Sequence, residues 1–442
     1  MTLEDLAALS RRDRTRVAVV AALLIVAILW ITLQFMQPAA PRRIVIASGP
    51  DFGLYHSYAQ RYRKALAREG VVVEERMTNG ATENLKLLRD PQSGVDVAFV
   101  QGGIVVPPPD DVAMIASLYY EPLWVFYRSG QPLTTLTDLA GKRIGVGVQG
   151  SGTRALVINL LTANGVTYAD GRGRAETTVV DVGGAQALGA LRAGNLDAVL
   201  LVGGADTPVI AEALRDPSVA LMSFARADAY SRRFSFIRRL TLPRGTLDFE
   251  QDLPHEDVKL IATEAMLASR PDLHPALSSL LLDAGREIHS RQSVFETAGE
   301  FPNVTQVDLP VSPDAERHMR FGPSFFHRHL PFWLATIVER TVVLIVPLLV
   351  VLIPLFNHLP QFLRWRVRRR IIRWYGELVM LEREIRTHAG PLPEALAQDV
   401  ERIDRAVGNL RTPASFASEV YTLREHVALV RESLEARGAV AV

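Results

Sequence analysis

The sequence predicts an α/β fold with two lobes, flanked by two apolar membrane-spanning helices and followed by a helical tail. Three observations lead to this prediction. Between residues 43 and 223, short apolar runs typical of buried parallel strands alternate with helical segments. Two long uncharged runs, at 17–36 and 341–363, are each long enough to cross a hydrocarbon core. Within 364–442, apolar residues recur at steps of three and four.

The amino-acid composition excludes several classes of function. The chain has 442 residues, enough for about three structural units. Its formal net charge is +1, which gives no overall attraction to nucleic acid, and we expect no nucleic-acid partner. The absence of cysteine excludes disulfides, thiolate metal sites and a cysteine nucleophile. We expect neither a metal nor a cofactor.

Arginine clusters orient the two apolar runs. Four arginines lie between residues 11 and 16, before the first run, and six follow the second run between 364 and 373. The positive-inside rule places both clusters in the cytoplasm and the segment between the runs outside it, at the inner membrane. A cleaved signal peptide is the alternative for the first run, and a buried core helix is the alternative for the second.

This topology divides the chain into seven parts. We expect a cytoplasmic lead-in at 1–16, a first span at 17–36, the first lobe at 41–128, the second lobe at 129–223, a return to the first lobe with a membrane-proximal segment at 224–330, a second span at 333–363 and a cytoplasmic helical tail at 364–442. The apolar stripes of the tail predict an antiparallel helical hairpin or a self-associating coiled coil.

Local patterns predict individual elements. VAMIASL and LWVFYR indicate two separate strands, and ENLKLLRD indicates a short helix for which Thr82 is a suitable N-cap. Residues 301–330 are rich in loop signals. His56 is followed by a serine but has no acidic partner at a telling spacing.

A glycine-rich junction is the strongest functional signal. A buried strand at 143–148 leads into a loop at 149–152 and then into an apolar helix closed by Gly165. Such a helix start presents free N–H groups and the positive end of the helix dipole to an anion. Ser151 is a suitable N-cap, whereas Arg154 in the first turn opposes the dipole unless an anion binds there. The alternative is a plain junction with Arg154 in water.

The junction has a weak internal counterpart. GVDVAFVQGG (residues 94–103) and NLDAVLLVGG (195–204) share an aspartate, an apolar run and a Gly-Gly exit. This similarity indicates two α/β lobes of like construction, with their loops facing one cleft. Ligands of such sheets bind beyond the carboxyl ends of the strands.

The order of these loops resembles the TAXI family, the solute-binding subunits of TRAP transporters. The resemblance covers 43–330 and rests on IASGPDFGLY, MTNGATENLKLL, VDVAFVQGG, YYEPLWVFYR, DLAGKRIGVGVQGSGTRALVINLL and LDAVLLVGGADTPVI. It implies a two-lobed clamshell of the type II periplasmic binding protein kind. It also implies a small organic anion of the amino-acid or dicarboxylate type, such as glutamate, between the lobes, and a TRAP permease as partner.

The resemblance also assigns site residues. Tyr120, Glu121 and Pro122 match the family pattern, as do Ser151 to Arg154. Two first-lobe loops lack hydroxyls that are usual in the family, and Gly103 replaces an acidic or amide residue. Glu121 is interpreted as a hinge or salt-bridge residue, since it would repel an anion. The predicted ligand-binding residues are Tyr55, Thr78, Asn79, Gln101, Ser151, Gly152, Thr153 and Arg154.

Three functions remain to be compared. The first is a membrane-anchored binding protein that delivers an organic anion to a permease. The second is a transmembrane sensor that signals through the cytoplasmic tail, by self-association or through a protein partner. The third is an outward-facing hydrolase that uses Ser151, which lacks both a G-x-S-x-G motif and an assignable His–acid pair. We expect no enzyme activity and no catalytic residue.

Overall fold

The computed structural model describes residues 11–35, 39–51, 53–104, 111–128, 130, 132–169, 177–305, 308–388, 393–410, 412 and 416–439. Residues 1–10 of the predicted lead-in and residue 36 of the first predicted span lie outside these ranges. The chain divides into two compact units, one formed by 39–338 and one by 1–38 with 339–442. Each unit is described by itself.

The larger unit is built on one curled sheet of eleven strands. Its main path runs β2-β1-β3-β11-β4-β8-β5-β7-β6, with β10 paired to β11 and β9 paired to β4. The strands are β1 (Arg43–Ala47), β2 (Val72–Arg76), β3 (Val97–Gln101), β4 (Ala113–Arg128), β5 (Arg143–Gly145), β6 (Tyr168–Ala169), β7 (Thr177–Val180), β8 (Ala198–Val202), β9 (Val219–Leu221), β10 (Arg238–Leu242) and β11 (Val258–Ser269).

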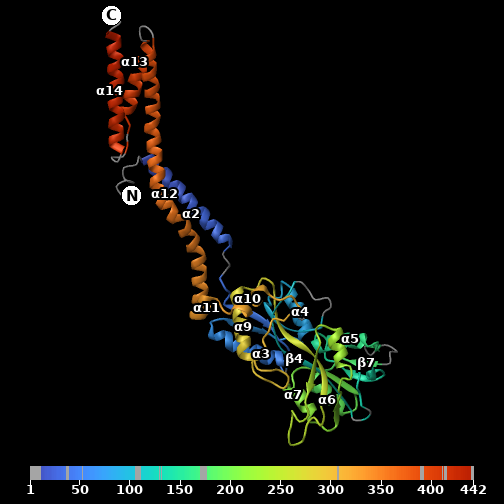
Figure 1. Ribbon diagram of the computed structural model, residues 1–442. Coiled ribbons are helices and arrows are strands. Elements are labelled where there is room, and N and C mark those ends of the chain that lie inside the picture. Colours follow the sequence, from blue (N-terminus) through green and yellow to red (C-terminus); the bar gives the residue numbers. More distant parts are fainter. Residues whose placement is uncertain are drawn as a thin grey trace. The chain divides into compact units, whose positions relative to one another are not determined.

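Helices cover this sheet and connect its parallel strands, as Figure 1 shows. The pairings of β1 with β2 and β3, and of β5 with β7 and β8, are parallel. This is the arrangement that alternating strands and helices predict. The helices are α3 (Leu54–Arg68), α4 (Ala81–Arg89), the 3-10 helix η1 (Leu136–Leu139), α5 (Gly152–Ala163), α6 (Gly184–Arg192), α7 (Pro208–Leu214), α8 (Ala227–Arg233), α9 (Pro275–His289), α10 (Pro313–Phe321) and α11 (Phe325–His329).

The unit has two lobes because its apolar residues form separate cores. The first half of β4 packs in one core through Ile115 and Tyr119, whereas Leu123 and the residues after it pack in the other. Strand β11 is divided in the same way. These two long antiparallel strands therefore join the lobes, and they cross between them near Glu121, which pairs with Thr263. The predicted α/β class is confirmed.

Three local predictions were wrong. The two strands expected between residues 112 and 128 are one strand, β4, because it serves both cores. The segment expected to be loop-rich contains α10 and α11, which begin after Ser312 and Ser324. Helix α4 begins two residues earlier than expected, with Gly80 as its N-cap, so Thr82 lies inside the helix.

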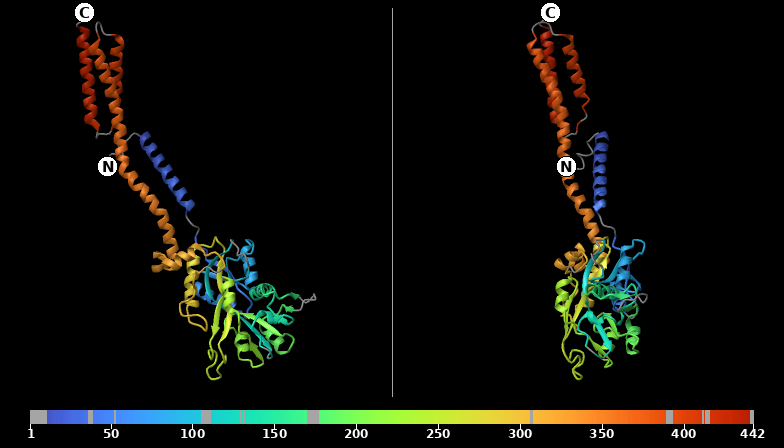
Figure 2. Two further views of the ribbon diagram at one scale, coloured as in Figure 1. Left: turned by 45° about the vertical axis from the view of Figure 1, so that its right-hand side comes forward. Right: turned by 90° about the vertical axis from the view of Figure 1, so that its right-hand side faces the viewer.

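The smaller unit is helical. It contains α2 (Arg11–Phe35), the part of α12 (Phe332–Thr387) that follows Val338, α13 (Glu394–Gly408) and α14 (Ala417–Ala439). The end of α12 lies beside α13 and α14 in an up-down-up bundle, as both views of Figure 2 show. The predicted tail hairpin therefore has a third helix, since Ile371, Leu378 and Ile385 of α12 fill its core.

One helix in the described part of the chain is long and apolar enough to cross a membrane, at Phe332–Pro354 within α12. Its apolar side chains are largely exposed, with Val350 at 64% and Ile353 at 56%. This exposure disfavours the alternative of a buried core helix. In α2 the apolar part that qualifies is shorter, at Ala22–Gln34. A first span therefore stays a prediction.

Candidate functional site

A cavity of about 610 Å³ lies between the two lobes. It is located beyond the carboxyl ends of β3 and β8 and at the first turns of several helices, where α/β sheets bind ligands. Its volume falls in the range of small-molecule sites. The wall is formed by residues 50, 53–55, 79–81, 101 and 121 on the side of the first lobe and by 147–148, 151–153, 183–186, 200–203, 207–210 and 212 on the side of the second.

Six of the eight predicted site residues line this cavity. They come from three elements of the first lobe and from the start of α5 in the second lobe, and they are Tyr55, Asn79, Gln101, Ser151, Gly152 and Thr153. Thr78 and Arg154 are not part of its wall. Whether any of these residues contacts a solute stays a prediction.

The first turn of α5 presents backbone donors to the cavity. Ser151 is the N-cap, as expected: its hydroxyl accepts from the Arg154 amide at 3.2 Å and donates to the Val148 carbonyl at 2.8 Å. The Gly152 and Thr153 amides precede the first intrahelical donor, and in the described part of the chain they have no hydrogen-bond acceptor. They are the groups that a carboxylate would use at this helix start.

Arg154 has a carboxylate neighbour within the chain. Its Nε donates to Asp181 Oδ1 at 2.7 Å, and Gln149 Nε2 donates to the other oxygen of Asp181 at 3.2 Å. The sequence left open whether a bound anion or water compensates this cation at the positive end of a helix. Asp181 provides that compensation in the structure, outside the cavity wall.

Gln101 is the best-placed polar side chain of the first lobe. It ends β3, is only 4% exposed and lines the cavity. Its Nε2 has no hydrogen-bond partner among the described residues, which is costly for a buried amide. Its Oε1 lies against Gly152, where an added Cβ would come within 2.2 Å of it. The unpartnered amide group and the start of α5 therefore lie together.

The lobes contact each other on both flanks of the cavity. On one flank, the Glu83 amide donates to the Gly150 carbonyl at 3.2 Å, and Thr82 Oγ1 donates to the Ser151 carbonyl at 3.3 Å. On the other flank, a Cβ at Gly204 would lie 3.4 Å from Leu54 Cδ1. The structure therefore has the lobes closed on one another.

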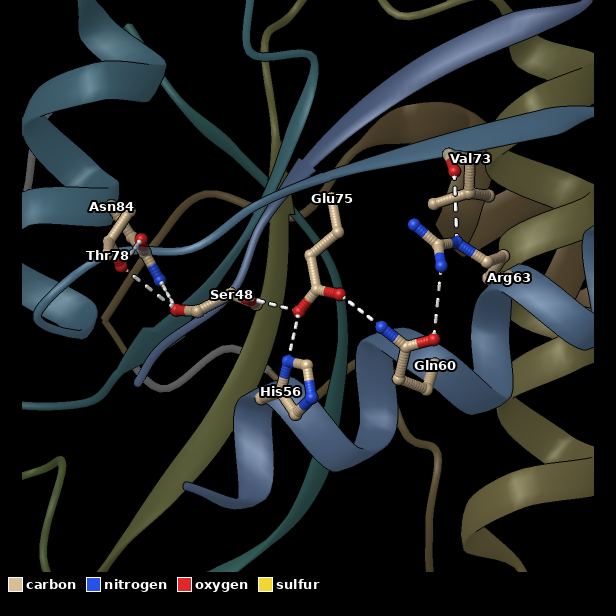
Figure 3. Close-up of polar contacts among 8 residues, drawn as sticks. All are labelled: Ser48, His56, Gln60, Arg63, Val73, Glu75, Thr78 and Asn84. Carbon is tan, nitrogen blue, oxygen red and sulfur yellow. Dashed lines mark hydrogen bonds and ion pairs between the residues drawn. The ribbon is translucent and has the colours of Figure 1, made fainter. Parts of the chain in front are cut away.

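Thr78 and Asn79 have local partners. The Thr78 hydroxyl donates to Asn84 Oδ1 at 2.6 Å and to the Ser48 carbonyl at 3.2 Å (Figure 3). The Asn79 backbone and side-chain amides both donate to Glu83 Oε2, at 2.9 and 2.8 Å. Threonine and asparagine often stabilise loops in this way. These contacts fix the loop that closes one end of the cavity.

Figure 3 also shows a buried carboxylate behind this loop. Glu75 accepts from Ser48 Oγ at 2.7 Å, contacts His56 Nδ1 at 2.8 Å and accepts from Gln60 Nε2. The acidic partner that sequence spacing did not reveal for His56 is therefore Glu75, on the neighbouring strand β2. Ser48 binds the carboxylate and not the imidazole, so the three side chains do not form a nucleophile–base–acid relay.

Glu121 is the cavity residue whose position sequence reasoning missed. It is 5% exposed, lines the cavity and accepts a hydrogen bond from Tyr55 Oη at 3.1 Å. Burial raises the pKa of Glu121 to about 8, although the Tyr55 hydrogen bond opposes this change. The available signal was the Tyr-Glu-Pro match to the family pattern, in which Glu121 was interpreted as a hinge or salt-bridge residue because it would repel an anion. Glu121 does lie where β4 crosses between the lobes.

Close packing explains why position 103 is a glycine. Its φ is +77°, and an added Cβ would lie 2.4 Å from the ring of Phe236. Its amide donates to Asp308 Oδ2 at 2.5 Å, and its carbonyl accepts from Asn159 at 3.1 Å. A side chain of the expected acidic or amide type has no room here.

Several solved structures resemble the chain at low identity. The periplasmic aliphatic sulphonate binding protein SsuA from Escherichia coli aligns at 14% identity over 57% of this chain and 74% of its own, with a TM-score of 0.36. The amino acid ABC transporter substrate-binding protein AbpA from Streptococcus pneumoniae, bound to L-arginine, aligns at 15% identity over 56% and 88%, with a TM-score of 0.35. An ancestral arginine-binding protein aligns at 15% identity over 56% and 92%, with a TM-score of 0.34.

A family model gives the assignment. The model described as the NMT1-like family matches residues 46–284, which is more than half of the chain. The matched segment includes the last two residues of β1, the α5 helix start and most of α9, and it contains every residue of the cavity wall. The protein belongs to the NMT1-like family.

Proposed function

We propose that this chain is a membrane-anchored, extracytoplasmic solute-binding protein that captures a small organic acid between its two lobes, in the manner of the TAXI subunits of TRAP transporters. One observation carries the proposal: the Gly152 and Thr153 amides and the Gln101 amide lie together at an interlobe cavity, and none of them has a hydrogen-bond acceptor among the described residues. Preorganised N–H donors at a helix start suit a carboxylate.

Within this proposal Arg154 acts from outside the cavity. Its guanidinium is paired with Asp181, so it contributes positive potential to the α5 helix start while the backbone amides and Gln101 make the direct contacts. Tyr55 and Asn79 complete the first-lobe side of the wall. Thr78 supports the loop from behind.

The binding test uses the full chain in detergent, titrated calorimetrically with organic acids that include glutarate and L-glutamate. Binding should weaken about ten-fold or more in Gln101→Leu, because the donor is lost, and only about three-fold in Arg154→Ala. Gln149→Leu is a matched control outside the cavity wall, since it removes an amide whose hydrogen bond among the described residues is to Asp181. Absence of binding across the panel would contradict the proposed function.

The proposed topology has two spans, both termini in the cytoplasm and residues 41–330 outside. The exposed apolar part of α12 and the arginines that follow it support the second span.

Because the native chain has no cysteine, single-cysteine variants report the side of the membrane without background. Glu250→Cys should react with a membrane-impermeant maleimide in intact spheroplasts, and Glu425→Cys should react only after lysis. Reaction of both before lysis would contradict this topology.

A sensor is the second candidate, and the continuity of α12 favours it. This helix begins at Phe332 in the larger unit and continues without interruption to Thr387 in the bundle. A shuttle to a permease would not need that bundle. Deleting residues 394–442 while keeping the arginine cluster separates the two roles: solute uptake persists if the chain is a shuttle, whereas a downstream response is lost if it is a sensor.

A further inference from the structure

Glu121 introduces a carboxyl group into a cavity proposed to hold an acid, and this inference rests on the proposed function. Its carboxyl is 5% exposed and lies on β4 where the strand crosses between the lobes. The hydroxyl of Tyr55 donates to it at 3.1 Å. In the described part of the chain no lysine, arginine or histidine lines the cavity with it. A buried carboxyl without a cationic partner is unfavourable when ionised.

The neighbours of Glu121 are aromatic and acidic. The Tyr119 hydroxyl is buried and, like the Tyr55 hydroxyl, lowers the pKa of Glu121 against the effect of burial, and the Tyr58 and Tyr119 rings are 4.9 Å apart. Arg61 lies 5.2 Å from the centre of the Tyr58 ring and is not part of the cavity wall. Several titratable groups surround this cluster. They are Tyr55, Tyr58 and Arg61 from α3, Tyr119 from β4, Asp206 from the loop before α7, His289 from α9, and Glu296 from the loop after α9.

These groups do not compensate the negative charge that Glu121 carries when it is ionised. Burial lowers the pKa of His289 to about 3, so this imidazole is neutral, and Glu296 accepts from the Tyr120 amide at 2.9 Å. Glu212, the other acidic residue of the cavity wall, is largely exposed and already pairs with Arg192 at 2.6 Å. Among the described residues, the cavity therefore has N–H donors without acceptors at the α5 side and a carboxyl without a cationic partner in the wall at the crossing of β4.

We propose that Glu121 binds a cationic nitrogen of the solute. The captured solute then combines a carboxylate, held by Gln101 and the α5 helix start, with an ammonium group, held by Glu121 beside the Tyr55 phenol. Tyrosine rings and a carboxylate together suit such a cation. A dicarboxylate satisfies the first group of contacts and leaves Glu121 without a partner. Glu121 therefore selects between the two solute classes that the proposed function leaves open.

The test compares acids that differ only by the ammonium group, using the full chain in detergent. L-Glutamate with glutarate and L-aspartate with succinate are two such pairs, within a panel that matches each amino acid to its deaminated acid. The amino member of at least one pair should bind about ten-fold or more tightly than its deaminated partner. Glu121→Gln should reduce this ratio to about two-fold or less, because it removes the charge at nearly constant shape. Glu212→Gln should leave the ratio unchanged.

A second readout uses the native sequence alone. Burial keeps Glu121 protonated at pH 7 in the unliganded protein, so an ammonium group that binds there must displace its proton. Calorimetry at pH 7 in buffers of different ionisation enthalpy should show close to one proton released per amino acid bound. An acid that accepts a hydrogen bond from protonated Glu121 gives no release.

The outcomes separate this inference from the proposed function. Equal binding of both members of every pair that binds overturns the role of Glu121 and leaves the solute-binding function in place. Binding without proton release does the same once the pH dependence of stability has shown that Glu121 is protonated at pH 7. Absence of binding by every acid in the panel overturns both. Loss of discrimination in Glu212→Gln as well as in Glu121→Gln also overturns the specific role, because it indicates a general effect of negative charge at the cavity.

Discussion

Gln101 and Gly152 approach so closely across the cavity that a Cβ on Gly152 would lie 2.2 Å from Gln101 Oε1. The same Cβ would lie 3.0 Å from the Cβ of Ala81. The end of β3 in one lobe and the first residue of α5 in the other are thus fitted to one another. A glycine is needed at 152 for space, since no positive φ is involved at this position.

The first prediction concerns this fit. Gly152→Ala should displace the Gln101 amide and weaken solute binding about ten-fold, while overpacking against Ala81 destabilises the protein by about 1–3 kcal/mol. The double variant Gln101→Ala/Gly152→Ala should recover part of the stability but not the binding. Thermal unfolding and calorimetric titration of the full chain measure the two effects.

Gly189 supplies the control for that substitution. It lies in the exposed middle of α6, and no atom comes within 4 Å of an added Cβ. Gly189→Ala should bind solute normally and gain about 0.5–1 kcal/mol from helix propensity. Normal binding by Gly152→Ala would show that Gln101 does not need its present position.

The second prediction is a pH dependence of stability. Folding raises the pKa of Glu121 from 4.5 to about 8 through burial. Between these values the folded state holds a proton that the unfolded chain has lost, so the free energy of unfolding falls as pH rises. A ten-fold change in an acid dissociation constant corresponds to about 1.4 kcal/mol, so the loss amounts to a few kcal/mol. Denaturation of the unliganded chain from about pH 5 to pH 9 measures the slope.

Two variants test the origin of this slope. Glu121→Gln should remove most of it and be more stable than the native chain at about pH 8, because the amide has no charge to bury. Glu212→Gln, at an exposed cavity position, should keep the slope. A slope that survives in Glu121→Gln would assign the titration to another group.

The third prediction concerns the pair of Arg154 and Asp181, whose side chains are 23% and 36% exposed. Pairs of this kind contribute about 0.2–1 kcal/mol, so Arg154→Ala should change stability little. Asp181→Asn should strengthen glutarate binding about two- to three-fold at low salt, and this gain should fade at high salt because it arises from unscreened positive potential. Complete loss of binding in Arg154→Ala would instead mean that Arg154 leaves Asp181 and contacts the solute.

The fourth prediction separates the two units. Leu423 is fully buried in the bundle core, so Leu423→Ala should destabilise the bundle by about 2–5 kcal/mol. Leu429→Ala, at a position 56% exposed, should have little effect. Limited proteolysis should show earlier cleavage after α12 in the first variant only. Solute affinity should be native in both, and a changed affinity would indicate coupling between bundle and cavity.

Much of the fold could be predicted because its signals are local. Alternation of apolar runs and helices predicted the α/β class, and α5 (Gly152–Ala163) begins at the end of the predicted loop and ends two residues before Gly165. The boundary between the lobes is not a local property. Strand β4 continues through it because β11 pairs with most of its length, and no residue between 113 and 128 indicates such a partner.

The site was harder to predict in two respects. The glycine-rich junction indicated the α5 start and the family resemblance assigned Gln101, and both line one cavity beyond the carboxyl ends of the strands. The sequence did not predict that Asp181 would pair with Arg154, because this contact depends on where the end of β7 lies beside α5. It did not predict that Glu121 would line the cavity, because the burial that raises the pKa of this carboxyl depends on the packing of α3 against β4.

The place of β11 in the sheet has a consequence for how this protein is made. β11 lies between β3 and β4 and pairs with both, yet it follows all of the second lobe in the chain. A ribosome therefore releases β1 to β4 long before the strand that joins β3 to β4 exists. We expect the first lobe to be synthesised first and completed last, with its open strand edges exposed until residue 269 has emerged.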